Sequence, residues 1–256
     1  MANNDSTKKT LLVAFSLCVV CSVIVSTAAV LLKPLQDANV EQDKKRNILG
    51  AAGMLEEGVD IDTQFSQISL KLVDLRTGQF SDAKDADSYD QVKAAREASS
   101  SDALDSQADT AKVGRREHYG LVYLVGDASN PEVIILPIRG AGLWGPLYGF
   151  IALEGDGNTV AGLGFYEHKE TPGLGGEVDN PRWKALWPGK QVYRDDRVAL
   201  HLIKGAVDRS RPDAVYEVDG LSGATLTSRG VSNLVQFWLG ENGYGPFLAN
   251  LKAGEA

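Results

Sequence analysis

The residues most informative about chemistry lie in a turn of small side chains near the C-terminus. A strand-like run ends at Asp219, and a turn rich in Gly, Ser, Ala and Thr follows over residues 220–228. The next residues repeat apolar side chains at i, i+3, i+4, i+7 and i+8, which predicts an amphipathic helix. Free N–H groups and the helix dipole favour a phosphate group at such an N-terminus. The apolar positions of the predicted helix are Val231, Leu234, Val235, Trp238 and Leu239.

The same turn can also be an ordinary helix start. Thr227 or Ser228 is of a type suited to the N-cap, and Gly240 is suited to end the helix. Spacing alone therefore leaves two interpretations open, a phosphate site and a capped turn without a ligand.

A third interpretation is a serine hydrolase with Ser222 as nucleophile, a histidine as base and Asp219 as the orienting acid. The nucleophile motif of such enzymes is G-x-S-x-G. Gly220 fits its first glycine, but Ala224 stands where the second glycine belongs. The hydrolase motif is thus incomplete in this chain.

Two glycine-rich segments precede this turn. Residues 140–145 have the G-x-G-x-x-G spacing of dinucleotide-binding folds, which require a helix to follow. Pro146 and a strand-like run follow instead, so we exclude that fold and expect a loop in which Trp144 could stack on a flat ring. Residues 167–176 form a Gly/Pro loop around His168, and its small residues would let the backbone approach a ligand.

Metal and thiol chemistry have little support. His118, His168 and His201 share no metal-ligand spacing, so we expect no zinc site. Cys18 and Cys21 lie inside an apolar run without a nearby His or acidic partner, which favours two small residues in an apolar helix over a redox or metal site.

The elements that must position these residues are mostly β-type. A short alternating stretch predicts a strand at residues 68–75, and runs rich in Val, Ile, Leu and Tyr with turn residues between them predict strands at 119–125, 133–138, 147–153 and 160–166. Residues 198–203 and 215–218 are two further candidate strands. A helix is predicted over residues 36–49, and the charged residues 81–110 are expected to form exposed helix and loop. The fold class predicted is α+β, with an antiparallel sheet and a C-terminal helix.

An uncharged segment near the N-terminus predicts a membrane anchor. Residues 11–32 are 22 residues without a charge. A helix of that length is about 33 Å long, enough to cross a bilayer core. A cleaved signal peptide is the alternative, but the apolar run continues past the small residues 26–29, so an uncleaved anchor is favoured. Lysines flank both ends, so charge alone leaves the orientation open.

Composition excludes several classes. The chain has 256 residues, 26 Lys and Arg against 34 Asp and Glu, and a net charge of −8. This charge argues against a nucleic-acid partner, which would require a basic face. Two cysteines exclude a disulfide scaffold.

Two motifs together resemble those of a known family. The sequence DGLSGAT at residues 219–225 resembles the flavinylation motif of proteins that carry FMN as a phosphoester on threonine. The sequence TPGLG at residues 171–175 resembles a second motif of the same FMN-binding domain. With the single N-terminal span, the whole chain resembles the family formed by the C subunits of the sodium-translocating NADH:quinone reductases (NqrC); the G subunit of the Rnf complex belongs to a related family of similar plan.

The resemblance implies roles for individual residues. Thr225 matches the threonine that is esterified to the FMN phosphate, with Ser222, Gly223 and Ala224 around that phosphate. Asp219 and Gly220 belong to the motif recognised by a separate, magnesium-dependent flavin transferase. The isoalloxazine ring would lie among residues of the second motif, with an aromatic wall and a cation beside it, which are Thr171, Gly173, Leu174, Gly175, Trp144 and Lys204. No catalytic side chain and no metal ligand are implied.

The resemblance also implies an assembly and a location. The chain would be an electron-relay subunit of a six-subunit sodium-pumping complex, with lipid around its anchor, in a bacterial inner membrane. Residues 1–10 would be cytoplasmic, 11–32 transmembrane, 33–116 a membrane-proximal region, and 117–256 a periplasmic domain with covalent FMN. The alternatives are the Rnf G subunit, and a membrane-anchored binding module or serine hydrolase without flavin.

Overall fold

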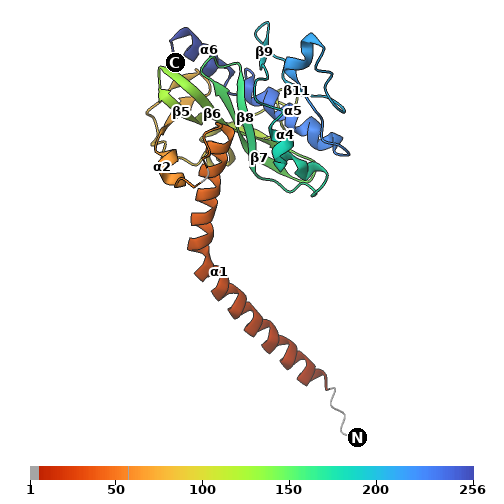
Figure 1. Cartoon of the computed structure of the whole chain (residues 1–256). Helices are drawn as coiled ribbons and strands as arrows, with labels where there is room; N and C mark the ends of the chain where they lie inside the picture. The colour runs from red at the N-terminus through yellow and green to blue at the C-terminus, as the bar shows by residue number, and fades with distance from the viewer. Residues whose placement is uncertain (1–5, 57) are drawn as a thin grey trace. The chain divides into compact units, whose positions relative to one another are not determined.

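The structure is a computed structural model that describes residues 6–56 and 58–256 (Figure 1). It divides into two compact units, residues 1–44 and 45–256. The first unit is most of α1 (Thr7–Ala51), a helix long and apolar enough to cross a membrane. The predicted span 11–32 and the predicted helix 36–49 are parts of this one helix, which continues through Pro34.

The second unit is built on an antiparallel sheet of six strands in the order β2-β1-β5-β6-β7-β8. This arrangement confirms the predicted α+β class with an antiparallel sheet. The central pairings are β1 with β5, β5 with β6 and β6 with β7, and residues such as Leu136 and Ile151 face each other in the β6–β7 register. The strands are β1 (Ile68–Asp74), β2 (Gln79–Phe80), β5 (Tyr119–Asp127), β6 (Asn130–Ala141), β7 (Pro146–Glu154) and β8 (Val160–Glu167).

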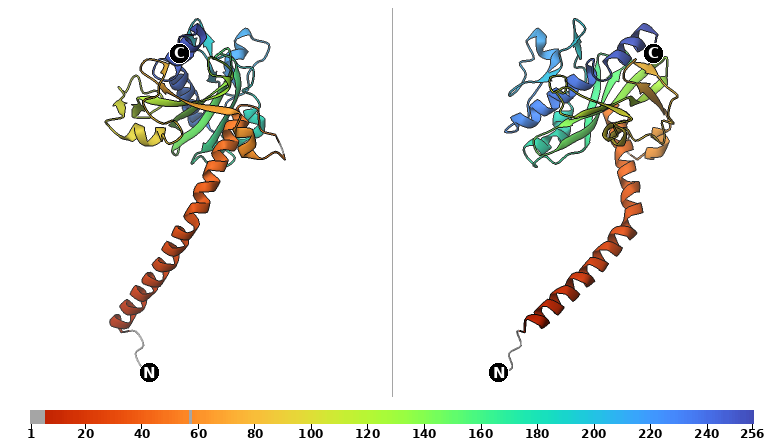
Figure 2. Two further views of the ribbon diagram at one scale, coloured as in Figure 1. Left: turned by 90° about the vertical axis from the view of Figure 1, so that its left-hand side faces the viewer. Right: turned by 180° about the vertical axis from the view of Figure 1, so that it is seen from behind.

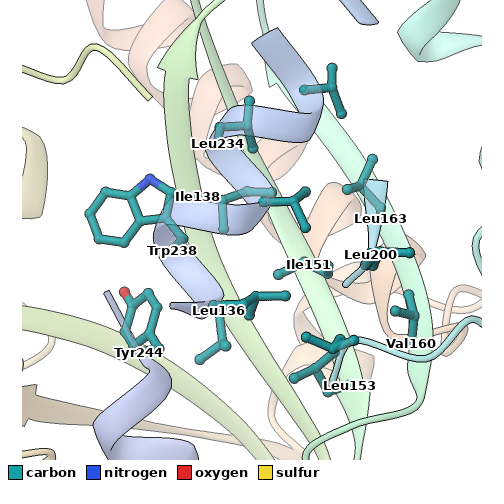
Figure 3. Close-up of a cluster of buried hydrophobic side chains, with 14 of the residues drawn as sticks. Leu136, Ile138, Ile151, Leu153, Val160, Leu163, Leu200, Leu234, Trp238 and Tyr244 are labelled. Carbon is teal, nitrogen blue, oxygen red and sulfur yellow. The ribbon is translucent and has the colours of Figure 1, made fainter. Parts of the chain in front are cut away.

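Both faces of the sheet are covered, which is why its central strands are apolar at nearly every position. One face packs against α5 (Thr225–Leu239) and α6 (Gly245–Ala253), drawn in blue in Figure 2. Figure 3 shows side chains of β6 and β7 interdigitating there with Leu234 and Trp238 of α5. The indole Nε1 of Trp238 also donates to the Arg139 carbonyl at 2.6 Å, which fixes α5 across β6.

The other face packs against the last turn of α1. Ile48 and Leu49 are buried there with Phe150 and Tyr123 of the sheet. The carbonyl of Ala51 approaches β8 so closely that a Cβ at Gly162 would lie 2.4 Å from its oxygen. The helix end is therefore part of the domain core.

Short elements surround the sheet, and several differ from the prediction. The segment 81–110 was expected to be helix and loop; it contains α3 (Gln91–Arg96) but also β3 (Ser101–Ala103), which pairs with β4 (Arg115–Glu117). The predicted strand 198–203 is split, because β10 (Arg197–Val198) pairs with β9 (Tyr193–Arg194) while β11 (His201–Leu202) pairs with β12 (Glu217–Val218). The remaining helices are α2 (Ile61–Phe65), η1 (Gly175–Asp179), α4 (Pro181–Lys184) and η2 (Pro212–Tyr216).

Candidate functional site

The N-terminus of α5 starts earlier than predicted. Thr225 is its first residue and Ala224 occupies the N-cap, so the expectation of a cap at Thr227 or Ser228 is wrong. The reason is that both hydroxyls have other partners. The Ser228 hydroxyl accepts from the Leu221 N–H at 2.9 Å and donates to the Ala224 carbonyl at 3.0 Å, and the Thr227 hydroxyl donates to Glu170. The predicted stop at Gly240 is confirmed as the C-cap.

The first turn of α5 has unsatisfied donors. Ala224 offers no side-chain oxygen, and within residues 6–56 and 58–256 we find no acceptor for the N–H groups of Thr225, Leu226 and Thr227. The Thr225 side chain is exposed. A hydroxyl nucleophile thus stands beside three free N–H groups and the positive end of a helix dipole, an environment suited to a phosphate on that hydroxyl.

A cleft of about 750 Å³ opens beside Thr225. One wall is the motif turn with Ser222 and Gly223, and the other is the loop around Lys204. Arg229, one turn further along α5 than Thr225, adds a second cation that the sequence analysis did not anticipate. The cleft therefore combines the predicted phosphate residues with two basic side chains.

Asp219 and Gly220 hold the two walls of this cleft together. The Asp219 carboxylate accepts from the Val207 N–H at 2.8 Å, and its carbonyl accepts from Nε1 of Trp183 at 2.9 Å. A Cβ at Gly220 would lie 2.2 Å from the Ile203 carbonyl oxygen, so only glycine permits this approach. The first two motif residues thus position the Lys204 loop against the turn at Ser222 and Gly223.

The second motif lies beside the first. Thr171, Gly173 and Leu174 are exposed, whereas Gly175 is buried at the start of η1. The Leu174 side chain contacts the turn at Gly223, where a Cβ would stand 3.0 Å from Leu174 Cδ2. The structure therefore brings the two predicted motifs together.

Trp144 and Lys204 line different clefts. Trp144 is 66% exposed and lies over a cleft of about 430 Å³ with Lys112, Arg139 and Tyr148. Burial acts to lower the pKa of Arg139, but its hydrogen bond to Glu117 and the charge of that carboxylate outweigh burial, so the pKa is raised. The predicted aromatic wall and the predicted cation are not brought into one cleft.

Glu170 is a site residue that sequence reasoning missed. Its side chain is 6% exposed and accepts hydrogen bonds from the Leu143 and Trp144 N–H groups and from the Thr227 hydroxyl. The available signal was an acidic residue directly before TPGLG, which by itself looks like part of a solvated turn.

The hydrogen bonds of the three histidines do not support the serine-hydrolase or metal-site interpretations. His118 bonds Asp102, His168 bonds Asp179 and His201 bonds a backbone carbonyl, each within 3.2 Å. Among the described residues no hydrogen bond joins a histidine to Ser222, and no group of three or more His, Cys, Asp or Glu side chains could hold a metal ion.

Comparisons with known proteins agree with this geometry. The FMN-binding domain family matches residues 142–240, which include both motifs. The C subunit of the Na⁺-translocating NADH-quinone reductase of Pseudomonas aeruginosa is 55% identical over 261 residues, and the match covers 100% of both chains. The C subunit from Vibrio vulnificus is 48% identical over 256 residues, with 99% of both chains covered.

Solved structures give the same picture. The crystal structure of Shewanella oneidensis NqrC superposes with a TM-score of 0.77 at 34% identity, over 84% of this chain and 99% of that one. The C subunit of the same reductase from Parabacteroides distasonis superposes with a TM-score of 0.65 at 29% identity, over 85% of this chain and 96% of that one.

Proposed function

The chain belongs to the NqrC family, the C subunits of the Na⁺-translocating NADH-quinone reductases, and from this premise we propose that it relays electrons through FMN esterified to Thr225. Membership makes it a subunit of that enzyme complex with an FMN-binding domain. The covalent bond and the relay are the proposed parts.

One observation carries the proposal: the exposed Thr225 hydroxyl stands at the start of α5 beside three N–H groups without acceptors among the described residues. A phosphoester retains negative charge, and these donors and the helix dipole stabilise it by about 0.3–1 kcal/mol, more when partly buried. The arrangement fits the phosphate end of FMN, and Thr225 is the motif residue with a free nucleophilic oxygen at that point.

The chain supplies binding and position, and FMN supplies the redox chemistry when bound. Ser222, Gly223 and the N-cap residue Ala224 would surround the phosphate, and Lys204 and Arg229 would add positive charge in the cleft beside it. The exposed Leu174 side chain beside Gly223 offers apolar contact to a ring system. Electron transfer needs no general acid or base, so the proposal gives no side chain a catalytic role.

The proposed ring contacts are those of the second motif and the two flanking side chains. Thr171, Gly173 and Leu174 lie at the surface beside the flavinylation turn, while Gly175 is buried beneath them. Trp144 and Lys204 line different clefts, so each is proposed separately as a contact of the ring.

We further propose the location and partners. Helix α1 would anchor the chain in a bacterial inner membrane, with residues 1–10 cytoplasmic, 11–32 in the bilayer, 33–116 as a membrane-proximal region and 117–256 as the periplasmic FMN domain. Support comes from the length and apolar character of α1 and from family membership. Partners would be the other subunits, lipid, and a flavin transferase that recognises the motif containing Asp219 and Gly220.

Intact mass and peptide mapping test the proposal. The full-length chain, produced in a host with the flavin transferase and washed under denaturing conditions, should be heavier by one FMN less one water. The added mass should map to the peptide that contains Thr225. A chain with only the mass of its amino acids would reject the covalent relay.

A further inference from the structure

Glu170 is a buried carboxylate whose role the proposed function leaves unexplained. It is 6% exposed, and among the described residues it has no cationic partner within ion-pair distance. Burying such a charge is costly unless hydrogen bonds satisfy it. Oε1 accepts from the Leu143 N–H at 2.9 Å and the Trp144 N–H at 3.0 Å, and Oε2 accepts from the Thr227 hydroxyl. Three neutral donors from two distant segments thus converge on one side chain.

Two glycines leave room for this carboxylate. A Cβ at Gly142 would lie 2.5 Å from Oε1, and a Cβ at Gly175 would lie 2.5 Å from Oε2 and 2.6 Å from the Thr227 hydroxyl oxygen. Neither glycine has a positive φ, so close packing rather than backbone conformation requires glycine there. The final glycine of the TPGLG motif is therefore explained by Glu170 and Thr227.

The backbone of Glu170 is held as well. Nδ1 of His168 accepts from the Glu170 N–H at 3.2 Å, and Nε2 lies 2.7 Å from the Asp179 carboxylate. With Nδ1 accepting, the ring proton resides on Nε2 and is donated to Asp179. The main chain that carries the Glu170 side chain is thus held by His168.

These bonds connect the parts of the site that would touch a flavin. The loop with Trp144, the TPGLG segment and the first turn of α5, which begins with Thr225, all meet at Glu170. We propose that Glu170 is a positioning residue: its carboxylate holds the Trp144 loop against the first turn of α5 and so fixes the surroundings of the flavin. This inference rests on the proposed function.

Two substitutions separate the hydrogen bonds from the charge. In Glu170→Gln the amide oxygen can accept both backbone N–H groups, and the amide NH₂ can donate to the Thr227 oxygen. Glu170→Ala removes every bond. Glu167→Gln is the matched control, because it changes an exposed glutamate at the end of β8 that makes none of these bonds.

The first measurement is amide hydrogen exchange in the full-length chain with Thr225→Val, which is free of covalent flavin. Hydrogen bonds to a charged acceptor predict that exchange at Leu143 and Trp144 accelerates about tenfold or more in Glu170→Ala. Glu170→Gln and Glu167→Gln should keep these amides protected. Equal protection in Glu170→Ala, or loss of protection in Glu170→Gln, would overturn the inference.

The second measurement is made on the flavin-carrying chain. Glu170→Ala should shift the visible circular dichroism and the midpoint potential of the flavin, and Glu170→Gln should retain the dichroism. A merely structural role would lower the melting temperature and leave both flavin signals unchanged, which would reject positioning. Should Glu170→Ala not fold, Thr227→Val removes one hydrogen bond with the side-chain shape kept, and unchanged flavin signals in that variant would reject it equally.

The intact mass of the wild-type chain distinguishes failure of the positioning proposal for Glu170 from failure of the proposed function. Wild-type chain without the FMN adduct would reject both the covalent FMN relay and the positioning role of Glu170. Hydrogen exchange could then still show the Glu170 hydrogen bonds, but only as contacts that stabilise the fold. Wild-type chain with the adduct and flavin signals insensitive to Glu170→Ala would reject only the positioning role.

Discussion

The side chain of Leu174 lies against the backbone of Gly223. A Cβ at Gly223 would stand 3.0 Å from Leu174 Cδ2, and Gly223 has φ +72°, a left-handed conformation that favours glycine. These residues come from the two motifs of the FMN-binding domain, which are far apart in sequence. Because of this contact, the exposed Leu174 side chain and the turn that leads to Thr225 form one continuous surface.

Replacing Thr225 tests the attachment site directly. Thr225→Val keeps the side-chain shape but removes the nucleophilic oxygen, so covalent flavin should be absent from the denatured gel band. Because Thr225 is exposed, the change in stability should stay within about 0.5 kcal/mol. Thr225→Ser should retain some flavin, and Thr77→Val, a matched change at an exposed threonine outside both clefts, is the control and should retain it. Covalent flavin in the valine variant would refute the site.

The two clefts give different predictions for Trp144 and Lys204. Trp144→Ala should shift the flavin absorbance, because an indole stacked on the ring perturbs its electronic transitions. Lys204→Gln should lower the midpoint potential, because a nearby cation stabilises the negative charge that reduction adds. Both are measured by spectroscopic redox titration of the flavin-carrying chain.

The control for this pair is Val215→Ala, which shortens an exposed apolar side chain outside both clefts. A spectrum unchanged by Trp144→Ala would remove the indole from the ring environment. A potential unchanged by Lys204→Gln would remove the cation from it.

The antiparallel sheet could be predicted because its strands are long and apolar. Strands β5 to β8 each contain a predicted run, and the two covered faces impose apolar side chains over most of each strand. Strands β9 to β12 have two residues each, too few for periodicity to set their bounds, and the predicted strand 215–218 accordingly covers β12 together with the end of η2. The predicted strand 198–203 was wrong because a single apolar run there serves two different pairings.

The candidate site could be predicted where local sequence decides it. The position of Thr225 and the preceding small residues, directly before an amphipathic helix, predicts a binding site at that turn. Glu170 does not, because its burial results from contacts with Leu143, Trp144 and Thr227, which are brought together only by the folded chain. The N-cap was misplaced for the same reason, since Thr227 donates to Glu170 and is no longer free to cap α5.

Asp219 combines a structural role with a proposed recognition role, and two variants separate them. Asp219→Asn keeps an oxygen that can accept from the Val207 N–H, whereas Asp219→Ala loses this bond at a cost of about 1–3 kcal/mol. If the transferase recognises the charge, Asp219→Asn should lose most covalent flavin while the Val207 amide stays protected from exchange. Full flavin content in Asp219→Asn would show that the transferase does not recognise the charge of Asp219. Asp208→Asn, an exposed change outside the cleft, is the control.

Gly175 should be intolerant of even one methyl group. The Cβ of Gly175→Ala would lie 2.5 Å from Glu170 Oε2 and 2.6 Å from the Thr227 hydroxyl oxygen, so one of these buried side chains must move. Overpacking of this kind costs about 1–3 kcal/mol. At about 2–4 °C for each kcal/mol in a domain of this size, the melting temperature of the full-length chain should fall measurably.

The loss of stability in Gly175→Ala should depend on whether the Glu170 side chain is present. Contacting residues are non-additive, so Gly175→Ala should be less destabilising when Glu170 is already alanine, because the methyl group then enters vacated space. Gly164→Ala is the matched control, since the nearest atom to its Cβ would be the Asn47 side-chain oxygen at 3.6 Å, an ordinary contact. Equal destabilisation by Gly175→Ala in both backgrounds would mean that the carboxylate is not what excludes a side chain at this motif position.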